Sequence, residues 1–128
     1  MAEDLLDHWV TLIKPIFPSN AWIVSEFSKN NHVIQIDWKL GNDSRQQNKR
    51  SRKIQIIIKE DAIDDYLDRN KPDRHLFNLI LKESLCERFN RFDPDNDALT
   101  IKSAPMETWL FSKDVLNELT NKHTSANL

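Results

Sequence analysis

The sequence predicts an α+β fold, a three-stranded antiparallel β-meander with an N-terminal helix before it and C-terminal helices packed on one face. Residues 32–40 alternate between apolar and polar side chains, and residues 52–59 repeat this pattern, as half-buried strands do. Residues 74–89 instead place their apolar side chains at helical spacing. Antiparallel pairing follows because strands with one buried and one solvated face are typical of antiparallel sheets.

The N-terminal segment, residues 4–14, predicts the first helix. Leu5, Trp9 and Leu12 recur at near-helical spacing. Pro15 should end this helix, because proline disfavours helical backbone at the residue before it. We expect Trp9 to anchor the core, since an indole contributes a large apolar area when it is buried.

Three strands are expected next, at residues 21–27, 32–40 and 52–59. The first two are separated by the polar residues 28–31, in which asparagine suits the left-handed positions of a tight turn, so these strands should form a hairpin. Ile57 is the exception to the polar outward side of the third strand. It suggests that this side is partly covered by something else.

Residues 41–51, between the second and third strands, contain no apolar side chain. Nothing in them offsets the ordering cost of about 1–2 kcal/mol per residue. We therefore expect a long, mobile hairpin loop.

The rest of the chain predicts helices separated by polar breaks. Asp61 is expected to cap a short helix, and Ser112 is expected to cap the last one. Residues 98–103 suggest a short fourth strand, whereas residues 105–111 are ambiguous between helix and strand. The polar residues 120–128 should fray.

The composition fits a single domain that covers residues 1–128. The single Cys excludes an internal disulfide, and Gly41, the one Gly, excludes the glycine-rich phosphate-binding loops. The net charge of −2 argues against a protein that coats nucleic acid with positive charge over its whole surface. An acidic start and the lack of an apolar run of 18 or more residues predict a soluble cytoplasmic protein that has no membrane contact.

A basic cluster is the strongest charge feature of the chain. Residues 41–60 hold six basic and two acidic side chains, a net charge of +4, while the segments on either side are net acidic. Such a loop can bind phosphates by counterion release, so nucleic-acid binding by the basic residues 45–53 is one hypothesis. A solvated loop tip is the other, because no aromatic side chain is interleaved for base stacking. The candidate contact residues are Arg45, Lys49, Arg50, Arg52 and Lys53.

A further alternative is a metal-dependent nuclease that uses Glu26, Asp37 and Lys39. A carboxylate on one strand and a D-x-K on the next suit a site in which carboxylates hold Mg²⁺ and a lysine steadies the attacking water. Against this hypothesis, the third strand, residues 52–59, contains no acid, and charged pairs across strands also stabilise sheets without any catalysis.

The function we expect is that of a small non-enzymatic protein that acts through protein–protein contacts, as a homodimer. No signature of a catalytic, cofactor-binding or metal-binding site is found in the sequence. The wide apolar face of residues 74–89 and the four Trp favour contacts with a partner. Trp109 and Phe111 mark the expected interaction surface, because they lie beside a last helix too short to bury them both.

Overall fold

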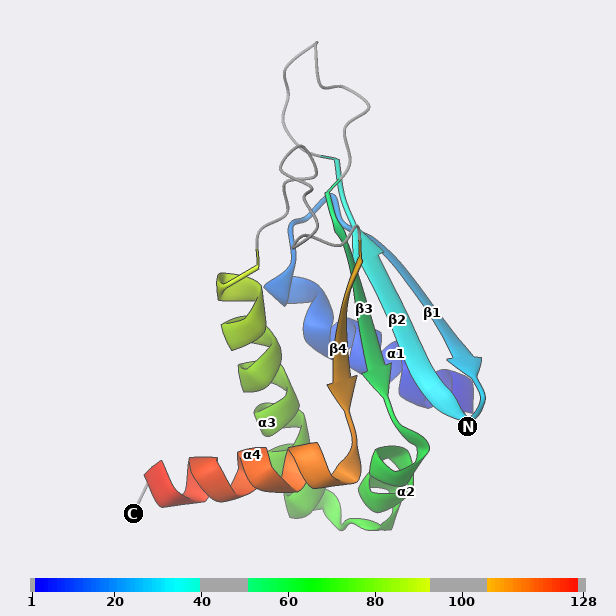
Figure 1. The fold of residues 1–128 in the computed structure, drawn as a ribbon. Coiled ribbons are helices and arrows are strands. Elements are labelled where there is room, and N and C mark those ends of the chain that lie inside the picture. The colour runs from blue at the N-terminus through cyan, green and yellow to red at the C-terminus, as the bar shows by residue number, and fades with distance from the viewer. Residues whose placement is uncertain (1, 40–50, 93–105, 127–128) are drawn as a thin grey trace.

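The structure is a computed structural model that describes residues 2–39, 51–92 and 106–126. Figure 1 shows the arrangement of helices and strands. In chain order the elements are α1 (Ala2–Ile13), the 3₁₀ turn η1 (Lys14–Ile16), β1 (Trp22–Ser28), β2 (Asn31–Asp37), β3 (Lys53–Ile58), α2 (Glu60–Asp68), α3 (Lys71–Asn90), β4 (Met106–Phe111) and α4 (Lys113–Ala126).

The fold is α+β, as predicted, but the sheet has four strands and is mixed. Its order is β1-β2-β3-β4, in which the first three strands form the expected antiparallel meander and β4 pairs with β3 in parallel. Parallel pairing requires a long crossover, and α2 and α3 lie in it. The ambiguous residues 105–111 thus supply the fourth strand, while residues 98–103, predicted as that strand, lie outside the described residues.

The helices pack on one face of the sheet, where the hydrophobic core lies. Trp9 is fully buried, which confirms its prediction as a core anchor. Leu67 of α2 and Leu79 of α3 are exposed, although other apolar side chains of these helices are buried. Fully burying a large aliphatic or aromatic side chain contributes roughly 1.5–3 kcal/mol. The largest fully buried side chains are Trp9, Ile13, Ile34, Ile36, Ile54, Ile56, Ile58, Phe77, Leu81, Leu85, Phe111 and Leu116.

A two-residue turn fixes the register of β1 against β2. Lys29 and Asn30 have φ angles of 54° and 66°, and positive φ at both central residues defines a type I′ turn. Ser28 pairs with Asn31 directly beside the turn. The Asn31 side-chain Oδ1 also accepts a hydrogen bond of 2.9 Å from the Glu60 main-chain N–H, which ties the hairpin to the start of α2.

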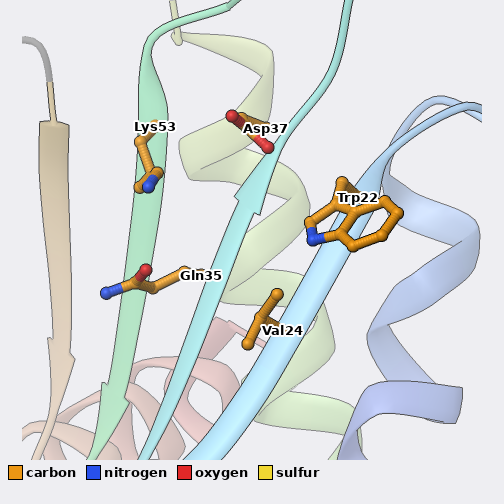
Figure 2. Close-up of a pocket in the computed structure, with 5 residues that line it drawn as sticks. All are labelled: Trp22, Val24, Gln35, Asp37 and Lys53. Atoms are coloured by element: carbon orange, nitrogen blue, oxygen red, sulfur yellow. The ribbon is translucent and has the colours of Figure 1, made fainter.

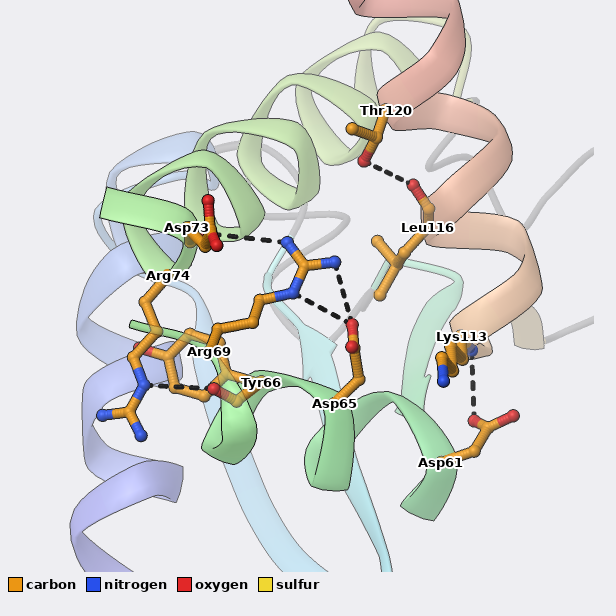
Figure 3. A network of polar contacts seen from close by, with 9 residues as sticks. All are labelled: Asp61, Asp65, Tyr66, Arg69, Asp73, Arg74, Lys113, Leu116 and Thr120. Atoms are coloured by element: carbon orange, nitrogen blue, oxygen red, sulfur yellow. Dashed lines mark hydrogen bonds and ion pairs between the residues drawn. The ribbon is translucent and has the colours of Figure 1, made fainter. Parts of the chain in front are cut away.

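Arginines fasten the junction between α2 and α3, as Figure 3 shows. A nitrogen of the Arg69 guanidinium lies 2.8 Å from Asp65 Oδ2, and another donates to the main-chain oxygen of Asp73. Arg74 donates from Nε to the main-chain oxygen of Tyr66 at 3.0 Å. The Arg74 bond adds a donor to a carbonyl in the last turn of α2, where carbonyls lack the usual partners inside the helix.

The two expected helix caps have different outcomes. Ser112 caps α4 as predicted, because its Oγ accepts a hydrogen bond of 3.2 Å from the Val115 N–H. Asp61 does not cap α2, since it lies inside that helix. Its Oδ1 instead accepts a hydrogen bond of 3.1 Å from the Lys113 N–H, so it joins α2 to the start of α4.

Two segments expected to be frayed or mobile, residues 120–128 and 41–51, contain residues with a defined structure. α4 extends to Ala126, past Thr120, where we expected fraying to begin. Ser51, assigned above to the mobile loop, is buried, and its N–H donates to the Trp38 oxygen at 2.7 Å. Its Oγ also accepts a hydrogen bond of 3.0 Å from the Trp38 N–H. The predicted loop therefore ends before Ser51, and residues 41–50 lie outside the described residues.

None of the described helices combines the length and the hydropathy that crossing a membrane requires.

Candidate functional site

The face of the sheet opposite the helices, called the open face below, has no described helix packed on it. Figure 2 shows side chains projecting from this face while the helices lie behind the strands. The strand register places Trp22 beside Asp37, Val24 beside Gln35, and Glu26 beside Val33. The open face includes Trp22, Val24, Glu26, Ser28, Val33, Gln35, Asp37, Lys53, Gln55, Ile57, Met106, Thr108 and Leu110.

A shallow, open depression with a volume of about 440 Å³ lies at one end of this face (Figure 2). The Trp22 indole, which is 67% exposed, forms one side of the depression, and Asp37 and Lys53 contribute its charged groups. Val24 and Gln35 complete the lining. An apolar ring beside one carboxylate and one ammonium provides a contact surface with both apolar and charged groups.

Glu26 does not converge with Asp37 and the neighbouring Lys39. Glu26 pairs with Val33, which lies four residues before Asp37 on the same strand. At about 3.3 Å per residue, that separation is roughly 13 Å along the sheet. The described residues contain no group of three or more His, Cys, Asp or Glu side chains able to hold a metal ion. The geometry therefore offers no support to the nuclease hypothesis.

The basic cluster is only partly within the described residues. Arg45, Lys49 and Arg50 lie outside them. The guanidinium carbon of Arg52 lies 5.2 Å from the centre of the Phe92 ring, while Lys53 projects from the open face. Arg52 and Lys53 thus contact different surroundings, and together they do not form a single basic surface.

Trp109 and Phe111 are core residues. They are 3% and 0% exposed, because both face the helices and not the open side of the sheet. The exposed apolar side chains of β4 are instead Met106 and Leu110, which alternate with them along the strand. The interaction surface predicted at Trp109 and Phe111 is corrected accordingly.

The strand at residues 21–27 was predicted, but sequence reasoning missed that β1 lies at an exposed edge of the sheet. It is an edge strand, and no described strand pairs with its outer side. Trp22 and Val24 are exposed on the open face, and Phe27 is 39% exposed on the helix side. The strand contains neither proline nor lysine, the residues that commonly protect an edge from pairing with another chain. The apolar character of residues 21–27 and their lack of proline and lysine were visible in the sequence, but nothing in the sequence placed this strand at an edge.

The turn geometry determines which main-chain groups of β1 face outward. In a type I′ turn the carbonyl of Ser28 accepts a hydrogen bond from the N–H of Asn31, so this pair is hydrogen-bonded. Hydrogen-bonded and non-bonded pairs then alternate along an antiparallel ladder. The N–H and C=O groups of Ile23, Ser25 and Phe27 consequently point away from β2. We call these groups and their strand the β1 edge.

His32 is the most perturbed titratable group described. It is fully buried, and its ring centre lies 4.8 Å from that of Trp9 and 4.0 Å from that of Phe27. Neither ring nitrogen has a hydrogen-bond partner within the described residues. Burial lowers the pKa of His32 from 6.5 to about 4, because the charged imidazole cannot be solvated there.

A second depression, of about 660 Å³, lies between α3, β4 and α4. Its charges are mixed: Glu87 and Glu107 on one hand, Arg88, Arg91 and Lys122 on the other. Arg91 pairs with Glu87 at 3.3 Å. A groove in which both signs are present in similar number does not select a ligand of one charge.

No protein-family model matches this chain, and neither a curated protein nor a solved structure is significantly similar to it.

Proposed function

We propose that this chain is a cytoplasmic protein–protein interaction module that associates with itself, and that β1 is its contact element. The observation that carries the proposal is the exposure of large apolar side chains on both sides of this one strand, Trp22 and Val24 on the open face and Phe27 on the helix side. This edge strand exposes apolar side chains to water on both faces. Covering them with another surface therefore lowers the free energy.

The depression beside Trp22 is a second observation in favour of β1 as the contact element. It places a large indole beside Asp37 and Lys53, so a partner meets both apolar area and charges of either sign. A surface with both signs can match a second copy of itself, as a two-fold symmetric contact requires.

Trp22 offers a direct test of the proposal. The other three indoles, those of Trp9, Trp38 and Trp109, are buried, so acrylamide quenching of fluorescence reports mainly on Trp22. Quenching should weaken as the protein concentration rises from about 1 to 500 μM, in step with a rise in mass by sedimentation velocity. Trp22→Phe is the control, because its quenching should be small at every concentration. A single monomeric species with constant quenching over the whole range would refute the proposal.

A further inference from the structure

We infer that two copies of this chain associate by antiparallel pairing of their β1 edges about a two-fold axis at Ser25, which joins their sheets into one of eight strands. This inference rests on the proposed function, and it names the partner, the contacting groups and their register.

The main-chain groups of the β1 edge are self-complementary. Ile23, Ser25 and Phe27 present outward N–H and C=O groups at every second position, with Ser25 in the middle. Antiparallel pairing about Ser25 sets Ile23 opposite Phe27 of the second copy and Ser25 opposite its own counterpart. All three positions then form hydrogen-bonded pairs, and each such pair exchanges two bonds. A shift by two residues in either direction loses one of these pairs.

The side chains fit the same register. On the helix side, Ile23 of one copy meets Phe27 of the other, so the half-exposed ring gains an apolar neighbour. On the open face, Val24 meets Glu26 of the second copy, and Trp22 meets its Ser28. No two like charges lie directly opposite each other in this register. Like charges in that position would destabilise the pairing.

The size of the contact predicts a weak dimer. Seven residues at about 3.4 Å each give an edge about 24 Å long, and a sheet with its side chains is about 10 Å thick. The contact is therefore roughly 240 Å² in projection per copy, well below the ~800 Å² per partner of a standard stable interface. We expect a dissociation constant in the micromolar range or above, as for transient contacts.

Ser25→Pro tests the main-chain pairing. The Ser25 N–H points outward, so proline there removes no hydrogen bond to β2 but deletes the central donor of the interface. We expect at least a tenfold weaker dimer by sedimentation velocity, with the circular dichroism spectrum of the wild type. Ser25→Ala keeps the N–H and is the matched control, which should dimerise as the wild type does.

Two charge variants at one position test the register and do not depend on proline being tolerated. Val24→Lys places an ammonium opposite Glu26 of the second copy and should tighten the dimer about threefold or more, whereas Val24→Glu places two carboxylates opposite each other and should weaken it by a similar factor. Leu110→Lys is the control on the far edge strand of the same face, and it should leave the dimer unchanged because β4 lies outside the contact.

The outcomes separate the inference from the proposed function. If the folded Ser25→Pro variant dimerises as strongly as the wild type, the strand pairing is overturned but self-association is not. If Leu110→Lys weakens the dimer as much as Val24→Glu does, the strand pairing is also overturned, in favour of contact between two open faces. A wild type that stays monomeric to 500 μM overturns both. Loss of the dimer in Ser25→Pro, together with opposite effects of Val24→Lys and Val24→Glu, supports the inference.

Discussion

Acidification should destabilise this protein through one side chain, His32. The imidazole is fully buried between the rings of Trp9 and Phe27, and neither of its nitrogens has a partner among the described residues. Protonation there creates a buried positive charge, and the surrounding aromatic rings offer it no strong hydrogen-bond acceptor, so the charged form is unfavourable. Burial accordingly lowers the pKa of His32 to about 4.

The sign and size of the effect follow from the two pKa values. Below pH 6.5 the unfolded chain takes up a proton at His32, whereas the folded chain does not until about pH 4. The free energy of unfolding therefore falls as the pH drops from about 6.5 towards 4 and, as far as His32 is concerned, levels off below 4. Each unit of pKa difference corresponds to about 1.4 kcal/mol, so the full loss at His32 is about 3 kcal/mol.

His32→Leu isolates this contribution, because leucine is apolar and does not titrate. Urea denaturation of wild type and variant at pH 7, 6, 5 and 4 gives the free energy of unfolding for each. We expect the stability of the variant relative to the wild type to rise by about 3 kcal/mol between pH 7 and pH 4.

A matched substitution controls for the loss of one imidazole. His75 is an exposed histidine of α3, and His75→Leu should keep the wild-type pH dependence because the His32 imidazole remains in place. If wild type and His32→Leu lose stability in parallel as the pH falls, the reasoning about the buried imidazole is refuted.

Three further changes test individual contacts by thermal or urea denaturation. Ser51→Ala leaves the buried Trp38 N–H without its acceptor and should cost about 1–3 kcal/mol, and a loss below 0.3 kcal/mol would contradict the importance of that bond. Lys29→Asn should stabilise the protein by about 0.5–1 kcal/mol, since Asn tolerates positive φ better than Lys, and destabilisation would contradict the type I′ assignment. Asp61→Ala removes the acceptor of the Lys113 N–H and should cost about 0.5–2 kcal/mol, whereas an unchanged midpoint would show that water replaces it.

The sequence was most informative where the hydrophobic period was clean. β2 and β3 each place isoleucines at every second position, and the structure buries Ile34, Ile36, Ile54 and Ile56 against the helices as predicted. β4 was ambiguous because its apolar residues occupy both faces, with Leu110 outward and neighbouring rings inward. Its parallel partner is also remote along the chain, and no local pattern indicates such a pairing.

The position of the proposed contact surface could not be predicted from the same pattern. Residues 21–27 are apolar at both odd and even positions, so the sequence does not decide whether Trp22 or Ile23 faces the core. The failure of Glu26 and Asp37 to meet was, in contrast, predictable. A two-residue turn at Lys29 and Asn30 fixes the register and sets Glu26 opposite Val33.

The parallel pairing of β3 and β4 has a consequence for the order of folding. The hairpin of β1 and β2 closes through two residues, whereas Gln55 and Thr108, which share a side-chain hydrogen bond of 3.2 Å across the parallel pair, are separated by 53 positions. Each doubling of the separation adds about 0.6 kcal/mol of closure entropy, so the meander should form first and β4 should dock late. Until it docks, β3 is itself an edge, and the nascent sheet is unprotected on both sides.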